Sequence, residues 1–396
     1  MAKTKYTKID GSSKEYWGLF GITGFLALLA PLSALYIFVN GHHVTGMTNQ
    51  VPWGLPIVMA VYLIGASAGS LVLSAMSSVF GKKEFKPFSR MAALLAILLI
   101  IAALMAIILD WGRPDRLMLP FFYFQPRSMF SLNAILYSAY VGLCGIYLWA
   151  MFNDKGKLEK LLGISAVFLA VLVHSGTGAI FGFVYVRELY NSPLLSPAFI
   201  AAALSSGTAM MIIMIHGTFK LTGRHVDAKL IYSLAKLMGI FIIVVLYFIF
   251  VENLTRAYAP KNYEAVSFLL FNGGKYTNLF WVGLLGLGLI IPMSIVLNPK
   301  TGKSTLFVLI AAWMQLIGVV IERYIIVIPP QVLPLELFPD KQITSTFLDG
   351  QIASYNISFV EICYSIGLIG VVLFGFIVCI KLWPMLPTEA HYQELD

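Results

Sequence analysis

Apolar positions dominate this chain and gather in long runs separated by short polar segments. From Met91 to Leu109, for example, no charged residue occurs. A helix needs about 20 apolar residues to cross the hydrocarbon core of a bilayer. We therefore predict an all-α integral membrane protein with about ten transmembrane helices. The ten runs lie at residues 17–39, 55–80, 88–110, 129–152, 161–185, 197–219, 230–252, 277–297, 304–328 and 356–383.

The order of the spans suggests an internal repeat. Spans 2–5 and spans 6–9 correspond pairwise, and the members of each pair run in the same direction because four spans separate them. Small residues at 65–70 and 205–207 would let helices approach closely. We predict two four-helix bundles with flanking helices, in a single polytopic domain over residues 1–396. Residues 1–16 form an N-terminal segment, 17–383 the ten-helix region and 384–396 a tail.

Composition supports the membrane assignment and excludes one alternative. The chain is 59% hydrophobic and 12% charged, whereas soluble domains carry about 25% charged residues. The net charge of +8 could suggest nucleic-acid binding. However, the cations lie in short loops between apolar runs instead of forming one soluble basic face, so we expect no nucleic-acid partner.

The distribution of Lys and Arg predicts the orientation. One set of termini and loops holds 17 of these residues and the opposite set holds 9, with Lys236 inside span 7 left out. Cytoplasmic loops carry the excess of Lys and Arg. Both termini are therefore predicted to be cytoplasmic, in the inner cell membrane. The outer loops 111–128, 253–276 and 329–355 are longer and rich in Pro and aromatics, which favours a docking partner outside over loops that merely vary in length.

Charged residues within the spans fall on one side. Span 3 ends at Asp110 and span 7 at Glu252, while Glu322 and Arg323 lie in the last third of span 9. Glu361 lies about five residues from the start of span 10. With the predicted orientation, all five are in the outer leaflet or at its edge. A charge near the centre of a membrane costs about 2.5–3.5 kcal/mol on insertion scales, so each should be paired or face a cavity.

Two interpretations of these charges remain open. Asp110 could form a helix-end ion pair with Arg113, and Arg323 could pair with Glu252 or Glu361. Glu322 and Arg323 point about 100° apart on a helix, so each needs a partner elsewhere. The five charges form either a structural network or a polar pocket for a headgroup or for proton transfer.

Three further polar residues lie within spans. His174 is near the middle of span 5, where it precedes Ser175-Gly176-Thr177-Gly178. Asn133 and Tyr137 lie one turn apart in the outer half of span 4. They could hydrogen-bond a quinone carbonyl, or make a plain interhelical contact. His174 and His216 differ by roughly 10–15 Å in depth, which disfavours a b-type haem.

The cysteines favour neither a cluster nor a disulfide framework. Cys144, Cys363 and Cys379 all lie in apolar runs, and no CxxC or CxxCH pattern occurs. We therefore expect no iron–sulfur cluster, haem or metal site in this chain.

Several motifs together resemble the NrfD/PsrC-type membrane subunits of complex iron–sulfur oxidoreductases. Asp110-Trp111-Gly112-Arg113-Pro114 is similar to the D-x-G-R-P turn of that family. The resemblance continues along most of the chain, and its ten-span form looks most like relatives in periplasmic hydrogenase, Dsr-type and alternative complex III assemblies. The other matching segments are Pro52-Trp53-Gly54, residues 128–133, His174-Ser175, Glu252, Glu322-Arg323-Tyr324, Glu361 and residues 382–387.

The resemblance implies a quinone-interacting subunit, not catalytic alone, in a respiratory complex for sulfur compounds or related anaerobic respiration. Such subunits exchange electrons between an extracytoplasmic four-cluster ferredoxin-like iron–sulfur protein and menaquinone or ubiquinone. A molybdopterin or other catalytic subunit and a cytochrome c are further partners, with membrane lipids around the chain. The first core helix departs from the polysulfide reductase pattern, because residues 57–63 offer only Tyr62 as a polar contact.

We predict a role for each candidate residue. Asp110, Glu252 and Glu361 exchange protons, and Arg113 and Arg116 dock the partner. The quinone contacts are Tyr137, Asn133, His174, Arg323 and Glu322. Two other functions remain as alternatives: a proton or ion transporter that uses Glu252, Arg323 and Glu361, and a passive membrane anchor.

Overall fold

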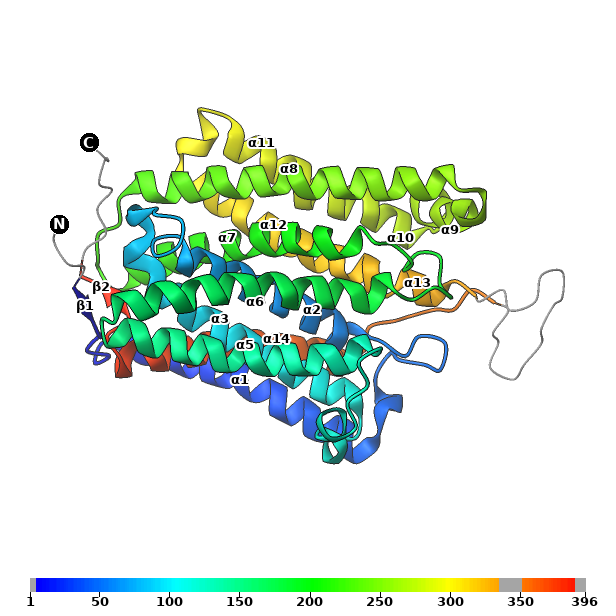
Figure 1. The fold of residues 1–396 in the computed structure, drawn as a ribbon, viewed down its shortest axis with the longest axis horizontal. Coiled ribbons are helices and arrows are strands. Elements are labelled where there is room, and N and C mark those ends of the chain that lie inside the picture. The colour runs from blue at the N-terminus through cyan, green and yellow to red at the C-terminus, as the bar shows by residue number, and fades with distance from the viewer. Residues whose placement is uncertain (1–4, 335–350, 389–396) are drawn as a thin grey trace.

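Ten long apolar helices form the body of the protein, as the sequence predicts. The structure is a computed structural model that describes residues 5–334 and 351–388. Figure 1 shows the long helices lying side by side along one common direction. They are α1 (Lys14–Asn40), α2 (Leu55–Ala75), α3 (Ser89–Trp111), α5 (Met129–Phe152), α6 (Gly156–Gly182), α7 (Leu195–Leu221), α8 (Ala228–Tyr258), the interrupted helix α10–η6–α11 (Lys275–Asn278, Leu279–Ile290 and Ile291–Leu297), α12 (Thr305–Val327) and α14 (Phe359–Leu382).

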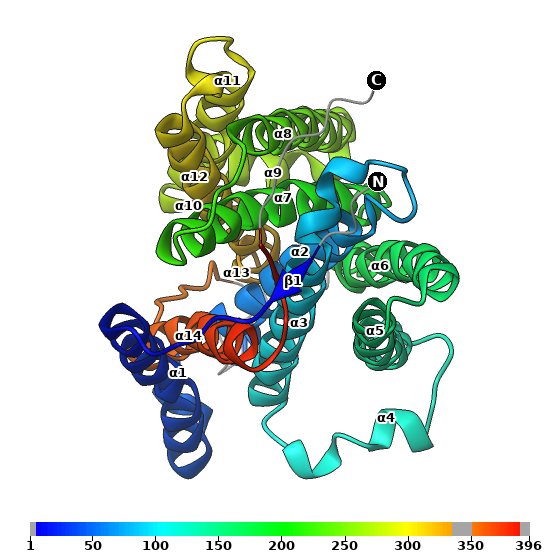
Figure 2. The ribbon, with the colours of Figure 1, turned by 90° about the vertical axis from the view of Figure 1, so that its left-hand side faces the viewer.

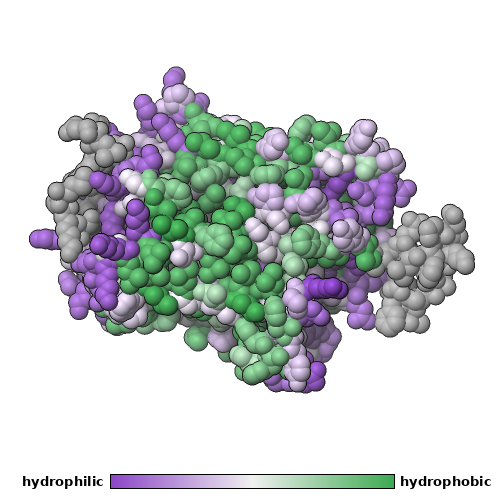
Figure 3. Space-filling model, viewed as in Figure 1, coloured by the Kyte–Doolittle hydropathy of each residue, from purple (hydrophilic) through white to green (hydrophobic). Residues whose placement is uncertain are grey.

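The surface of this body has the layering of a membrane protein. Apolar residues cover its middle, and hydrophilic residues gather at both ends (Figure 3). The chain is therefore a multi-pass membrane protein. Parts of the predicted N-terminal segment, of the tail and of the outer loop 329–355 lie outside the described residues.

Helix α2 lies at the centre of the packing. It contacts α3, α6, α7 and α12, and 89% of its most apolar stretch is buried inside the protein (Figure 2). Helices α1 and α14 pack on each other, and α14 also packs on α3. The division into two four-helix bundles stays a prediction, because α2 and α6 of the first group pack directly on α7 of the second.

Both described ends of the chain lie at the same end of the molecule. Strands β1 (Tyr6–Thr7) and β2 (Leu386–Pro387) pair there in an antiparallel manner (Figure 1). Arg90 ties them to the helices, since its Nη2 donates to Met151 O at 2.6 Å and its Nη1 to Pro384 O at 3.1 Å. The polar candidates of α3, α5, α8, α12 and α14 lie toward the opposite end. That this opposite end faces outward stays a prediction.

Short elements cover the candidate end. The side chain of Gln331 accepts a hydrogen bond from Trp53 N at 2.9 Å and donates to Trp53 O at 3.1 Å, and Arg187 Nη1 donates to Pro330 O at 2.7 Å. Segments far apart in sequence are thus joined above the helices. These elements are η1 (His42–Val44), η3 (Pro114–Arg116), α4 (Leu119–Phe122), η4 (Pro260–Asn262), α9 (Tyr263–Ser267), η5 (Phe268–Asn272) and α13 (Pro329–Val332). At the other end lie η2 (Lys83–Phe88) and η7 (Thr301–Lys303).

The predicted close approach at small residues is confirmed between α2 and α7. A Cβ added at Gly207 would overlap the backbone of Gly69, and one added at Gly69 would overlap the carbonyl group of Ala203. The two helices can therefore touch only because these positions carry no side chain.

A Gly207→Ala substitution should lower stability by about 1–3 kcal/mol, because the new methyl forces α2 and α7 apart. Gly217→Ala on the same helix is the matched control, since a Cβ there meets nothing within 4 Å. It should raise helix stability through its higher propensity. Thermal unfolding in detergent measures both, and a Gly207 variant that melts at or above the native midpoint would contradict the packing.

Candidate functional site

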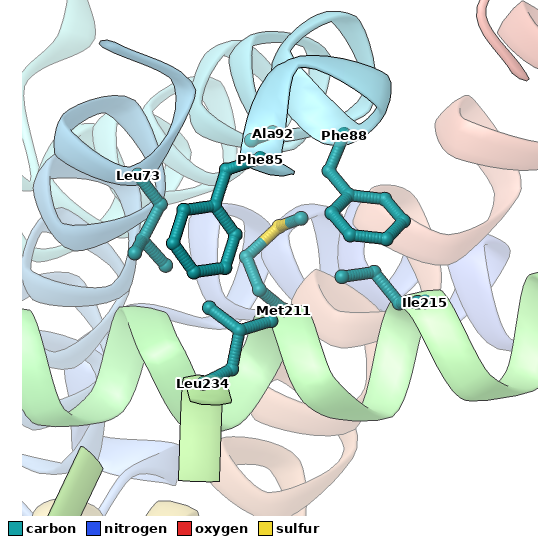
Figure 4. Close-up of a pocket in the computed structure, with 7 residues that line it drawn as sticks. All are labelled: Leu73, Phe85, Phe88, Ala92, Met211, Ile215 and Leu234. Carbon is teal, nitrogen blue, oxygen red and sulfur yellow. The ribbon is translucent and has the colours of Figure 1, made fainter. Parts of the chain in front are cut away.

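A small cavity near η2 is entirely apolar. Its lining side chains come from α2, η2, α3, α7 and α8, and none of them can form a hydrogen bond (Figure 4). This cavity therefore lacks the polar groups of a candidate site. The lining residues are Leu73, Phe85, Phe88, Ala92, Met211, Ile215 and Leu234.

Glu361 holds several segments together at the candidate end. It occupies the first turn of α14 and closes a capping box with Ser358. Its Oε2 accepts hydrogen bonds from Gly46 N and Ser358 N, both at 2.9 Å. Its Oε1 accepts from Tyr355 Oη at 2.7 Å and from Leu55 N at 3.3 Å. These four donors give Glu361 a structural task, and its role in proton exchange stays a prediction.

Glu361→Gln should loosen the connection between α1 and α2. One carboxylate oxygen is replaced by an amide NH₂ group, which cannot accept the hydrogen bonds that the surrounding N–H and O–H groups donate. Leaving buried N–H groups unpaired costs about 1–3 kcal/mol each. Hydrogen exchange at Gly46 and Leu55 should accelerate, whereas Glu264→Gln in the exposed part of α9 should leave it unchanged. Unaltered exchange in the Glu361 variant would show that its carboxylate does not hold this segment.

Asp110 is not the ion-pair partner of Arg113. Arg113 donates from Nε and Nη2 to the two carboxylate oxygens of Asp115, both at 3.1 Å. The alternative of an Asp110–Arg113 pair at the helix end is thus wrong, because Gly112 has a left-handed conformation that turns the chain after α3. The hydrogen bond from Arg113 lowers the pKa of Asp115.

Asp110 Oδ1 is buried and has no hydrogen-bond partner. It lies within electrostatic range of Glu361. His42, in η1, also has a buried Nε2 without a partner, and this atom would be 3.1 Å from a Cβ added at Gly112. Partial burial lowers the pKa of His42. Asp110 and His42 therefore both offer unmatched polar atoms at the end of α3.

The predicted pair on α5 contacts α6 directly. Tyr137 Oη and Thr177 Oγ1 are 2.9 Å apart, and Asn133 Nδ2 donates to Met129 O at 2.7 Å and to Gly176 O at 2.9 Å. Asn133 Oδ1 is buried without a partner. The interhelical contact that the sequence left open is therefore present, and an acceptor remains free beside it.

His174 lies one turn before Thr177 on α6 and is fully enclosed. It is 1% exposed, and neither of its ring nitrogens has a hydrogen-bond partner. Its Nε2 would lie 3.5 Å from a Cβ added at Gly65 of α2. A buried imidazole with two unmatched nitrogens is unusual, since buried polar groups are nearly always hydrogen-bonded.

Arg323 is the most unusual buried group. Its side chain is 0% exposed, and its Nε, Nη1 and Nη2 all lack hydrogen-bond partners. The guanidinium carbon lies 3.9 Å from the centre of the Phe199 ring. Its Nη1 is 3.7 Å from Glu322 Oε1, and His174 lies within its electrostatic range. The ion pair that the structure shows for Arg323 is therefore with its neighbour Glu322, so the expectation that these two residues each need a partner elsewhere is wrong.

Glu252 pairs along its own helix. Arg256 Nη2 lies 2.8 Å from Glu252 Oε1 and donates to Leu189 O at 2.7 Å. Helix α8 continues to Tyr258, six residues beyond the predicted end of its span. Our sequence reasoning missed Arg256, although its spacing four residues after Glu252 was the available signal.

The structure divides the predicted site residues into three neighbourhoods. Asp110 and Glu361 lie together, Asn133 and Tyr137 contact α6 beside His174, and Glu252 lies within electrostatic range of Glu322. His174 and Arg323 link the second neighbourhood to the third. The gathering of these residues around one quinone stays a prediction.

Arg113, which directly precedes η3, and Arg116, its last residue, are exposed, as a docking role requires. Their side chains are 60% and 58% exposed, and both are near Asp115. Over residues 5–334 and 351–388, no group of three or more His, Cys, Asp or Glu side chains could hold a metal. The three cysteines are free thiols.

Comparison with known proteins decides the family. Residues 43–334 match the family described as "Polysulphide reductase, NrfD". This chain belongs to the NrfD family. The match covers every candidate residue except Glu361, and it confirms the resemblance inferred from the D-x-G-R-P-like turn.

Several relatives are similar over nearly the whole chain. An Archaeoglobus fulgidus protein named "Hdr-like menaquinol oxidoreductase integral membrane subunit" is 41% identical over 99% of both proteins. A selenate reductase subunit of Mesobacillus selenatarsenatis is 30% identical over 95% of this chain and 96% of its own length. The "Menaquinone reductase, integral membrane subunit" of Nitratidesulfovibrio vulgaris is more distant, at 21% identity over 81% of this chain and 80% of its own length.

Proposed function

We propose that this chain is the quinone-interacting membrane subunit of a respiratory oxidoreductase complex. It exchanges electrons between an extracytoplasmic iron–sulfur subunit and menaquinone or ubiquinone in the membrane. The observation that carries this proposal is the 41% identity, over 99% of the chain, to a protein named as a menaquinol oxidoreductase membrane subunit.

The residues around Arg323 fit a quinone. A quinone carbonyl accepts hydrogen bonds, and the unmatched guanidinium nitrogens of Arg323 and an N–H of His174 can donate them. Tyr137 and Asn133 offer further polar atoms on the neighbouring helix. Arg323 thus positions a carbonyl oxygen and stabilises negative charge on it, while Phe199 beneath the guanidinium excludes water.

Quinone reduction takes up two electrons and two protons, so the site needs a proton carrier. Asp110 is suited to this role because its Oδ1 is buried and unpartnered near the candidate end. The electrons come from or go to the partner, which carries the iron–sulfur clusters in this proposal.

The partner docks on the outer end, where Arg113 and Arg116 are exposed. We propose a four-cluster ferredoxin-like subunit there, with a molybdopterin or other catalytic subunit and a cytochrome c further away. Both termini are then cytoplasmic and the inner cell membrane surrounds the helices.

Quinone turnover in the purified complex tests the proposal. Tyr137→Phe should raise the KM for a water-soluble quinone analogue, because it removes a hydroxyl from the proposed site. Tyr140→Phe is the matched control on α5, since Tyr140 Oη lies 3.1 Å from Ser67 Oγ and is not one of the proposed quinone contacts. A complex that assembles with its partner yet shows no quinone turnover would overturn the proposal and favour a passive anchor.

Proton translocation is a second candidate function. It is favoured by the series of buried ionisable groups from Glu252 through Glu322 and Arg323 to His174. Towards the other face the main candidates are Lys236 and His216. Liposomes distinguish the two functions. A translocating complex moves more protons across the membrane than the two that each quinone takes up or releases, whereas a purely electron-transferring complex exchanges only those two.

A further inference from the structure

A second cavity lies beside the proposed quinone site, on the far side of α7. It is enclosed by α7, α8, η5, η6 and α12, and its empty volume, including its open mouth, is about 560 Å³. Helix α7 packs on both α6, which carries His174, and α8, which lines this cavity. The polar lining residues are Glu252, Asn253, Arg256 and Glu322, and all other lining residues are apolar.

The polar lining atoms are unmatched. Glu322 Oε2 and Asn253 Oδ1 are buried without a hydrogen-bond partner, as is Arg256 Nε. Glu252 Oε1 is 2.8 Å from Arg256 Nη2 but makes no hydrogen bond. Glu252, Arg256 and Glu322 are each more than nine-tenths buried. Because Glu252 Oε1 is already in the ion pair, two unmatched acceptors, Glu322 Oε2 and Asn253 Oδ1, remain against one unmatched donor, and this excess indicates a ligand that donates hydrogen bonds.

The charges indicate that this ligand is neutral. Glu252 is paired with Arg256, and Glu322 lies 3.7 Å from Arg323. Two carboxylates beside two guanidinium groups leave no net charge to attract a cation. The apolar remainder of the lining, which includes Phe280 and Leu284, suits a ring with an aliphatic substituent.

The helix that lines this cavity is itself irregular. Residues Leu279–Ile290 of η6 form a π-helix, and Phe280 and Leu284 face the cavity from it. Such wide turns often occur at functional sites. The irregular segment thus lies where the unmatched polar atoms are.

We propose that this cavity is a second quinone site that binds the reduced, hydroquinone form in preference to the oxidised form. The two phenolic O–H groups of a hydroquinone donate to the carboxylate and amide oxygens, whereas the oxidised ring has only acceptors to present. The inference rests on the proposed function, and it adds a place where the reduced molecule resides on its way between the first site and the membrane.

The second site is tested by measuring the binding of menadiol, a reduced naphthoquinone without a tail. The measurement uses the whole complex in nanodiscs under anaerobic conditions. We expect two classes of menadiol site in the native protein. Ala198→Phe should fill the cavity and weaken one class at least tenfold, because Ala198 lines it and is 6% exposed. Asn253→Leu should weaken the same class and serves as a second variant should the first fail to fold.

Controls separate the second site from the first. Ile243→Phe, at a half-exposed position of α8, should leave both classes intact. Tyr137→Phe should weaken menadiol binding only at the first site, around Arg323. The binding of oxidised menadione should not change in the Ala198→Phe variant. Three results would overturn the second site alone. The first is that both cavity variants keep two unchanged classes of menadiol site, and the second is that Ala198→Phe weakens menadione binding as much as menadiol binding. The third is that a glycolipid is the sole occupant of the cavity. No binding of either form to the native complex would overturn the proposed function as well.

Discussion

Replacing Glu322 and Arg323 together, by Gln and Met, is expected to lower quinone-linked turnover by about 100- to 1000-fold. This is the loss measured when one preorganised donor is removed from a developing negative charge. Arg323 can supply such donors because its three guanidinium nitrogens have no other hydrogen-bond partner. The double variant is preferred, because Arg323→Met alone would leave Glu322 as a buried, unneutralised charge.

The same double variant should still fold. It removes both charges of the buried pair together, whereas leaving one of them uncompensated costs about 3–5 kcal/mol. Gln315→Met on α12 is the matched control, since Gln315 is fully buried and donates to Ser205 Oγ at 3.0 Å. It should cost about 1 kcal/mol of stability and leave turnover intact. A double variant that is stable and fully active would remove Arg323 from the mechanism.

Asp110→Asn is expected to lower quinone-linked turnover by about 100- to 10,000-fold while the complex still assembles. Positioned proton transfer contributes this much in general acid–base catalysis. The amide keeps the size of the side chain but cannot exchange a proton. Because Asp110 makes no ion pair with Arg113, this substitution should leave the partner-binding turn in place.

Asp115→Asn provides the comparison, since Asp115 is only five residues away and is exposed. It should leave turnover unchanged under saturating partner, although it releases Arg113 from its ion pair. Turnover and partner binding are measured on the same preparations. If Asp110→Asn keeps full turnover, the proton is carried elsewhere, and if it fails to bind its partner, Asp110 belongs to the docking surface.

The ten helices could be predicted because their apolar runs are long enough to span a bilayer, irrespective of their packing. The ends of the helices were harder to predict from the sequence. Helix α8 extends to Tyr258, and Glu252 and Arg256 pair across one turn within this extension. A hydropathy limit placed at the first charge therefore ends this helix too early.

The contacts that the site residues make were harder to predict than the identity of those residues. The sequence indicated His174, Arg323 and Glu322, and the structure places both His174 and Glu322 within electrostatic range of Arg323. It did not indicate His42, which a loop brings to Gly112 at the end of α3. Nor did it indicate Tyr355, whose hydroxyl donates to Glu361. Such contacts depend on how connections fold over the helices, and no spacing in the sequence records them.

The quinone content of the purified complex shows whether the residues around Arg323 bind a quinone. The complex is extracted with its surrounding lipid, and quinone is quantified per protein molecule in the native form and in the Glu322→Gln, Arg323→Met double variant. We expect a fixed amount of quinone per molecule of native protein and markedly less in the variant. An assembled native complex, with its iron–sulfur partner, that carries no more quinone than the lipid around it would contradict the account.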